Sequence, residues 1–121
     1  MQRVLFICSR NRLRSPTAEK IFTGPGIETD SAGLAPDAEC VLSADQVEWA
    51  DLVFVMEKQH RTKLKKRFRP ALGGKRVVCL DIPDRYEFMQ PELVELLTMK
   101  VGPHLSALAN KPREERRRNP G

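Results

Sequence analysis

The chain has 121 residues, of which 40% are hydrophobic and 31% are charged, and its formal net charge is +5. This length suits one folded domain with a single core, and the composition is typical of a globular protein rather than a disordered or fibrous one. Its apolar runs are far shorter than the roughly 18 residues of a membrane span, and the first residues lack the apolar core of a signal peptide, so we expect a cytoplasmic protein.

The first expected element is a buried strand over residues 3–7, a nearly continuous apolar run. A polar loop that opens with Cys8 follows, and Ser15 and Pro16 then predict a helix start, with serine as the N-cap. Where a strand leads through a loop into a helix, backbone N–H groups converge and the helix dipole adds positive potential. This arrangement binds phosphate and favours the thiolate form of a cysteine. The stretch therefore predicts a phosphate site with a reactive sulfur.

Strands and helices alternate along the whole chain. Apolar runs predict four strands, at residues 3–7, 27–33, 51–56 and 75–80. Helical patterns lie between and after them, at residues 15–22, 44–49, 57–68 and 91–99. Ser43 and Gln46 form a capping box before the second helix, and Gly102 with Pro103 is expected to interrupt the last one. The pattern predicts a three-layer α/β/α sandwich with a four-stranded parallel sheet.

The last eleven residues differ in composition from the rest of the chain. Residues 111–121 carry five basic and two acidic side chains and almost no apolar ones. We therefore expect a domain over residues 1–110 and a disordered basic tail over residues 111–121. The tail and the basic helix over residues 57–68 could contact a polyanion or a nucleic acid, although a solvated surface is the more common role of such charge runs.

The three cysteines, Cys8, Cys40 and Cys79, include no Cys-x-x-Cys pair. Their odd number and wide spacing argue against a disulfide framework and a zinc site, so we expect neither a metal nor a cofactor. Cys79 lies in an apolar run and is interpreted as a small buried hydrophobic residue, and Cys40 less firmly so. Cys8 differs because it opens the polar loop.

In α/β folds ligands bind beyond the carboxyl ends of the strands. Two loops that leave such ends carry unusual polar residues, one over residues 8–15 and the other over residues 81–86. We therefore expect the two loops to meet at one edge of the sheet.

These residues resemble the motifs of low-molecular-weight protein tyrosine phosphatases. Residues 8–16 read Cys-x5-Arg-Ser-Pro after a hydrophobic strand, and Asn11 stands where that family has a loop asparagine. Residues 30–33 resemble its Asp-Ser-Ala-Gly segment, and residues 82–86 resemble its late Ile-Pro-Asp-Pro-Tyr loop, with Arg85 in place of the second proline. The resemblance runs in order through residues 1–108.

The chain also departs from the family pattern. The region between residues 33 and 49 is short, and Leu13 stands where family members often have a second loop cysteine. Arg10 and Arg12 occupy positions that are usually small or apolar. These departures concern substrate specificity more than the chemistry, and the chain resembles a small, divergent bacterial-type branch of the family.

The resemblance implies a cysteine-dependent, metal-independent phosphatase that hydrolyses phosphate monoesters, such as phosphotyrosine or an aryl phosphate, through a phosphocysteine intermediate. Cys8 would be the nucleophile, Arg14 would hold the phosphoryl oxygens, and Asp84 would be the general acid, with Asp81 as its rival. The phosphate would be bound by the loop residues Ser9, Arg10, Asn11, Arg12, Leu13, Arg14 and Ser15. Supporting roles are expected for Asn11, Ser15, Ser31, Asp81 and Tyr86.

Two alternatives stay open at this point. The first is an arsenate reductase of the same fold, although the chain has only Cys79 near the late segment where that chemistry needs resolving cysteines. The second is a phosphate- or nucleic-acid-binding module, which Arg10, Arg12 and the basic helix suggest. A variant keeps the phosphatase but lets the two loop arginines select a polyanionic substrate.

Four other residues are interpreted from their local patterns alone. His60 and His104 have no paired ligand or nucleophile nearby in sequence, so both are interpreted as solvated residues. Tyr86 and Phe88 follow the predicted acid and are expected either to wall the substrate ring or to pack in the core.

Overall fold

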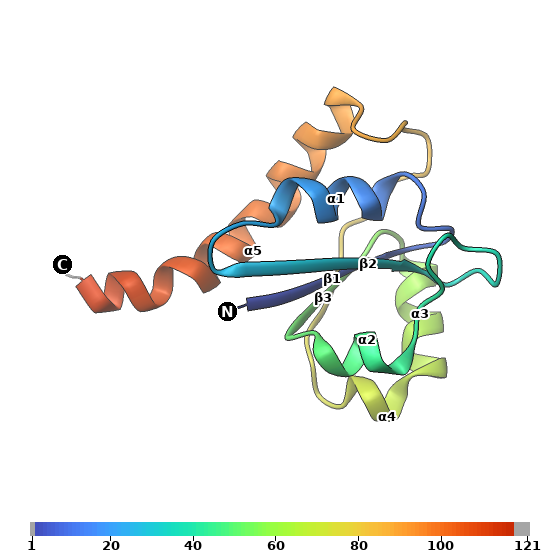
Figure 1. The fold of residues 1–121 in the computed structure, drawn as a ribbon, viewed down its shortest axis with the longest axis horizontal. Helices are drawn as coiled ribbons and strands as arrows, with labels where there is room; N and C mark the ends of the chain where they lie inside the picture. The colour runs from blue at the N-terminus through green and yellow to red at the C-terminus, as the bar shows by residue number, and fades with distance from the viewer. Residues whose placement is uncertain (1, 118–121) are drawn as a thin grey trace.

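A computed structural model describes residues 2–117, which form a four-stranded parallel sheet with the strand order β2-β1-β3-β4 (Figure 1). The strands are β1 (Gln2–Cys8), β2 (Ile27–Gly33), β3 (Leu52–Val55) and β4 (Val77–Cys79). The helices are α1 (Arg14–Phe22), α2 (Ala44–Trp49), α3 (Lys58–Arg67), α4 (Arg69–Leu72) and α5 (Pro91–Arg117).

The helices cover both faces of the sheet, α1 and α5 on one and α2, α3 and α4 on the other (Figure 1). Strand β1 divides its side chains between two cores: Val4 and Phe6 pack toward α1 and α5, and Leu5 and Ile7 pack toward the other helices. All four are fully buried, which explains why β1 reads as a continuous apolar run rather than an alternating one. The predicted three-layer α/β/α sandwich is confirmed.

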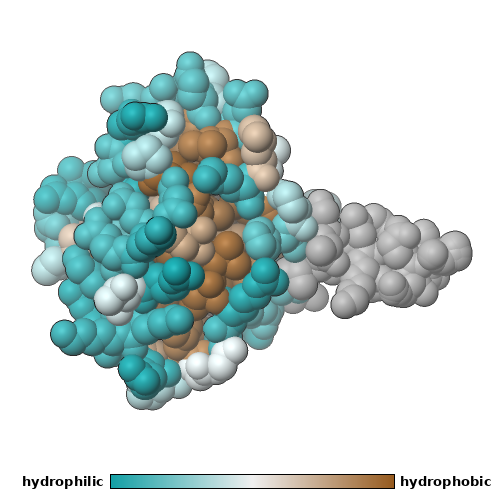
Figure 2. All heavy atoms as spheres, turned by 180° about the vertical axis from the view of Figure 1, so that it is seen from behind, coloured by the Kyte–Doolittle hydropathy of each residue, from teal (hydrophilic) through white to brown (hydrophobic). Residues whose placement is uncertain are grey.

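The two edges of the sheet are built differently. Strand β2 is an edge strand, as its mixed polarity predicts, and β4 is the other edge with only three residues, all half-buried. Figure 2 shows the molecule from behind the view of Figure 1, with apolar side chains reaching the surface between hydrophilic ones. A short strand limits the exposed pairing edge.

The start of α1 differs from the prediction. The N-cap position is occupied by Leu13, whose side chain makes no capping hydrogen bond, and Ser15 lies inside the first turn, fully buried. Ser15 is therefore not an N-cap, because its hydroxyl lies within hydrogen-bonding distance of the Cys8 sulfur instead. The capping box of Ser43 and Gln46 at α2 is confirmed.

The predicted break in the last helix was wrong, since α5 continues through Gly102 and Pro103. Proline cannot donate to the carbonyl four residues earlier, which belongs to Met99, a residue that is 68% exposed and can be hydrated there. On the packed side, the helix buries Leu93, Leu97 and Val101 completely. Leu105, beyond the proline, is buried in the same core, so the apolar stripe holds the helix to the sheet on both sides of Pro103.

Helix α5 also takes in part of the basic segment 111–121. The division of the chain at residue 110 stays a prediction, and residues 118–121 lie outside the described residues. Within the described part, no helix is long and apolar enough to cross a membrane.

Candidate active site

A pocket of about 520 Å³ opens at the carboxyl end of β1, above the loop that joins it to α1. We call residues 8–14 the Cys8 loop and residues 80–90, between β4 and α5, the Asp84 loop. The pocket is lined by Cys8, Ser9, Arg10, Arg12, Leu13, Arg14, Ala35 and Asp84. The two loops that were expected to meet at one edge of the sheet therefore share a single pocket.

Cys8 is the last residue of β1, and only 3% of its surface is exposed. The backbone N–H of Asn11 donates to its sulfur at 3.2 Å, and the hydroxyl of Ser15 lies 2.9 Å from the same atom. Both groups can donate a hydrogen bond to sulfur, and such donors stabilise a thiolate more than a thiol. The sulfur thus lies at the base of the pocket in surroundings suited to a nucleophile.

Asn11 holds the Cys8 loop in shape. Its φ of 57° places it in the left-handed region, which asparagine tolerates better than most residues. Its side-chain amide donates to the hydroxyls of Ser15 at 3.0 Å and Ser31 at 2.9 Å, and Ser31 in turn donates to the carboxylate of Glu19. Because the Ser15 oxygen accepts from Asn11, its own proton is available for the Cys8 sulfur. The structure places Asn11, Ser15 and Ser31 in one buried network around the sulfur.

Arg14 is 2% exposed and is held by groups from two other strand ends. Its Nη1 donates to the carboxylate of Glu57 and to the backbone carbonyl of Ile82 at 2.7 Å, while its Nε lies 3.7 Å from Asp84 Oδ1. Glu57 lies two residues after the end of β3, and the sequence pattern did not reveal that it pairs with Arg14. Burial raises the pKa of Glu57, but hydrogen bonds from Arg14 and Gln59 more than offset this, so the pKa lies below its usual value. Glu57 is therefore an anionic anchor for the guanidinium group.

The two aspartates of the Asp84 loop border different pockets. Asp84 lines the pocket with Cys8, and 59% of its side chain is exposed. Asp81 has a φ of 53° and accepts from the Cys79 thiol at 3.5 Å, and it borders a separate hollow beside Glu57. Only Asp84 of the pair lines the pocket with the sulfur.

The interpretation of His60 as a solvated residue was wrong. His60 is 1% exposed; its Nδ1 accepts from the backbone N–H of Glu57 at 3.1 Å, and its Nε2 lies 2.9 Å from the Ser9 hydroxyl oxygen. Burial and the nearby Arg14 charge lower its pKa to about 4. One feature of the sequence could have indicated this burial. His60 is the third residue of α3, soon after the end of β3, and there its ring completes a capping box with Glu57.

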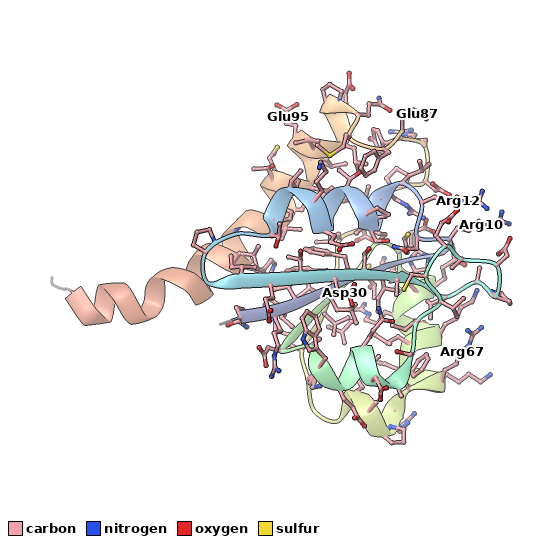
Figure 3. All side chains as sticks on the ribbon, in the orientation of Figure 1. Arg10, Arg12, Asp30, Arg67, Glu87 and Glu95 are labelled. Carbon is pink, nitrogen blue, oxygen red and sulfur yellow. The ribbon has the colours of Figure 1, made fainter. Side chains whose placement is uncertain are left out.

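Figure 3 shows Arg10 and Arg12 close together at the outer rim of the Cys8 loop. Each pairs with an acidic residue of the loop that follows β2: Arg10 with Asp37 at 3.6 Å and Arg12 with Glu39 at 3.4 Å. All four side chains are more than half exposed. Backbone bonds from Ala35 N to Ser9 O and from Glu39 N to Arg10 O join the same two loops. The partners of the arginines were not foreseen from the sequence.

The remaining predicted residues take less central positions. Tyr86 packs against the core below α1 and α5, with the Arg85 guanidinium 5.8 Å from its ring centre. Phe88 borders a different hollow, beside Pro16 and Lys20. Cys40 is exposed, which differs from its interpretation as buried. Among the residues that the structure describes, no group of three or more His, Cys, Asp or Glu side chains could hold a metal ion.

Several solved structures share this fold over most of its length. The low-molecular-weight protein tyrosine phosphatase SP-PTP from Streptococcus pyogenes has a TM-score of 0.71 and 17% sequence identity, covering 89% of this chain and 93% of that one. The tyrosine phosphatase Wzb from Escherichia coli K30, solved in complex with sulphate, has a TM-score of 0.69 and 19% identity over 88% and 98%. The YwlE arginine phosphatase from Geobacillus stearothermophilus has a TM-score of 0.64 and 21% identity over 90% and 97%.

No protein-family model and no curated protein sequence matches the chain. At these identities the likeness concerns architecture, and the chain has the fold of the low-molecular-weight protein tyrosine phosphatases.

Proposed function

We propose that this protein is a cysteine-dependent phosphatase that hydrolyses phosphate monoesters through a phosphocysteine intermediate on Cys8. The observation that carries the proposal is that one pocket brings together the Cys8 sulfur, the Arg14 guanidinium and the Asp84 carboxylate. A phosphoryl-transfer site needs a nucleophile, a cation for the phosphoryl oxygens and a proton donor for the leaving group. Structural neighbours that are tyrosine and arginine phosphatases add support.

In the first step the Cys8 thiolate attacks phosphorus, and the bond from phosphorus to the leaving oxygen breaks. Asp84, in its protonated form, gives its proton to that oxygen and becomes a carboxylate. In the second step the carboxylate takes a proton from water, the water oxygen attacks the phosphocysteine, and inorganic phosphate leaves as the thiolate returns. Arg14 stabilises the equatorial phosphoryl oxygens in both steps, because its planar fork can hold two of them.

The arsenate reductase alternative gains no support from the positions of the other cysteines. Cys79 packs with the core on the α2, α3 and α4 side of the sheet, whereas Cys8 belongs to the core on the opposite side. A disulfide between them would need Cα atoms within about 7 Å of each other and side chains that face one another. The two side chains lie on opposite faces, so Cys79 is a poor resolving thiol for Cys8.

The binding-module alternative rests on the loop arginines, and their charges are offset. Asp37 and Glu39 pair with Arg10 and Arg12 at the pocket rim, so the rim carries equal numbers of acidic and basic groups in these pairs.

A phosphorylated protein or small phosphate ester is the partner class that we propose. We also propose a cytoplasmic location, since the three cysteines are all free, as is usual in a reducing compartment.

Hydrolysis of an aryl phosphate by purified variants tests the proposal. Cys8→Ser should abolish turnover, and Asp84→Asn should lower kcat by about two to four orders of magnitude for esters with poor leaving groups and by less for good ones. Asp81→Asn is the matched control and should stay within about threefold of the wild type. Turnover by Cys8→Ser would overturn the nucleophile assignment, and a larger loss in Asp81→Asn than in Asp84→Asn would reassign the acid.

A further inference from the structure

His60 connects the start of α3 to the Cys8 loop, and it is a buried side chain that the two reaction steps leave without a role. It lies within hydrogen-bonding distance of one group at each ring nitrogen, the backbone N–H of Glu57 at Nδ1 and the hydroxyl of Ser9 at Nε2. Ser9 follows Cys8 directly, is half-buried and lines the pocket. A buried histidine thus contacts the hydroxyl of a residue that lines the pocket next to Cys8.

The contact at Nδ1 decides which nitrogen carries the proton. Because the Glu57 N–H points its hydrogen at Nδ1, that nitrogen must accept, and the ring proton must lie on Nε2. The Nε2–H then donates to the Ser9 oxygen at 2.9 Å. Protonation of Nδ1 would place its N–H against the N–H of Glu57. This environment therefore selects the neutral tautomer with the proton on Nε2.

The orientation of the Ser9 hydroxyl follows from this tautomer. A hydroxyl has one proton to donate, and when its oxygen accepts from a fixed donor the proton must be directed elsewhere. Ser9 lines the pocket beside Cys8, and a bound phosphoryl group would bring anionic oxygens there. From this geometry we propose that the Ser9 hydroxyl is a phosphate-binding donor and that His60 is the positioning residue that holds it in the donating orientation. This inference rests on the proposed phosphatase function only in that the pocket binds a phosphoryl group.

The protonation state of His60 suits its role in positioning the Ser9 hydroxyl. Burial first and the nearby Arg14 charge second lower the pKa of His60 to about 4, so the ring stays neutral at physiological pH. A neutral donor fixes the serine without placing a second positive charge against the Arg14 guanidinium. A hydrogen bond from serine to an anionic oxygen is of the charge-assisted kind, and its loss should weaken binding about 10- to 100-fold.

Three single variants separate this role from a purely structural one. Ser9→Ala removes the donor. His60→Asn keeps a carbonyl oxygen near the position of Nδ1, where it can still cap the Glu57 N–H, but its side chain is too short to reach Ser9. His60→Gln places its amide nitrogen near the position of Nε2 and can still donate to Ser9. The asparagine variant therefore retains only the contact with the Glu57 N–H, and the glutamine variant retains only the contact with Ser9.

Two readouts are measured, the affinity for inorganic phosphate by calorimetry and kcat/KM for an aryl phosphate. Ser9→Ala and His60→Asn should each weaken phosphate binding and kcat/KM by about tenfold or more, whereas His60→Gln should stay within about threefold of the wild type. The Ser9→Ala/His60→Asn double variant should be no worse than Ser9→Ala alone, because His60 acts through Ser9. Thermal unfolding of each variant identifies any that fail to fold.

The inference is overturned if Ser9→Ala binds phosphate as the wild type does, a result that needs no substitution at the buried histidine. Equal losses in His60→Asn and His60→Gln, or additive losses in the double variant, would also overturn it, since they indicate a structural role. Phosphate binding is measured without turnover, so a wild-type protein that binds phosphate but hydrolyses no ester would count against the proposed function alone.

Discussion

At the scale of single residues, the guanidinium group of Arg14 needs a partner of opposite charge because it is buried. It is a charged group that is 2% exposed, and its ion pair with Glu57 differs from the surface pair of Arg3 and Asp51, whose side chains are 44% and 39% exposed. Water screens the surface pair, which contributes little to stability. Removing one partner of a buried pair instead leaves the other charge without compensation. Glu57 therefore contributes both to folding and to the position of the guanidinium group.

Replacing Glu57 by glutamine tests this dual contribution. Glu57→Gln should lower the free energy of unfolding by about 2 kcal/mol and kcat/KM by about tenfold or more, because the neutral amide leaves the Arg14 charge partly uncompensated. Asp51→Asn is the matched control at the exposed pair, and it should cost less than about 1 kcal/mol and leave kcat/KM unchanged. Urea denaturation and steady-state kinetics measure both effects. Similar costs for the two substitutions would contradict the buried role of Glu57.

At the scale of elements, the end of β2 sets how closely the loop after it approaches the Cys8 loop. Gly33 is the last residue of β2 and lies opposite Cys8 in the strand register. A Cβ atom at Gly33 would be 2.5 Å from the Ser9 carbonyl oxygen and 2.7 Å from the Ala38 Cβ. Both distances are well inside van der Waals contact, so only glycine allows this approach.

Gly33→Ala should therefore push the Cys8 loop out of position. We expect a loss of about tenfold or more in kcat/KM and of about 1–3 kcal/mol in the free energy of unfolding, because the clash involves backbone that cannot rotate away. Gly74→Ala is the control, since nothing lies within 4 Å of a Cβ built there. Kinetics and denaturation of both variants provide the comparison. Wild-type activity in Gly33→Ala would show that the loop tolerates the shift.

At the scale of the whole molecule, the parallel sheet assembles the site from three strand ends. Cys8 ends β1, Glu57 follows β3 by two residues, and Asp84 lies in the loop that leaves β4. In the strand order β2-β1-β3-β4 these three strands are neighbours. Residues far apart in sequence therefore converge on Arg14, and the stability of the whole fold becomes linked to the ionisation of groups in the site.

The pH dependence of global stability should report this linkage through His60. Its pKa is lowered from 6.5 to about 4, so between these values the unfolded chain binds more protons than the folded one. The contribution of His60 to the free energy of unfolding is complete above about pH 6.5. It is lost as the pH falls toward 4, by an amount on the order of 2 kcal/mol.

Denaturation of the wild type and of His60→Asn at several pH values measures this contribution. The variant should lack the part of the slope that lies between about pH 6.5 and 4.5. Glu57 and Asp51, whose pKa values are lowered from 4.5 and 3.8, lose their contributions only at lower pH, so they do not obscure this window. Identical slopes for the two proteins would contradict a buried, neutral His60.

The sequence by itself determined the order of the four strands and of the helices other than α4, the phosphatase-like loop at Cys8 and the convergence of two loops at one sheet edge. Each depends on short-range information: apolar periodicity, helix-capping residues, and motif spacing within a parallel α/β chain. Its errors included Ser15, which faces the sulfur instead of capping α1, and Pro103, where the packed stripe of α5 outweighs a lost hydrogen bond. It also misjudged the burial of His60 and of Cys40.

Only the tertiary structure decided the surroundings of Arg14 and Ser9. Glu57 and His60 open a strongly basic helix, and in sequence they look like solvated residues. They are functional candidates because β3 lies next to β1, which places the start of α3 against the Cys8 loop. The burial and the hydrogen-bond partners of a polar side chain depend on residues distant in sequence, and local patterns carry no information about these contacts.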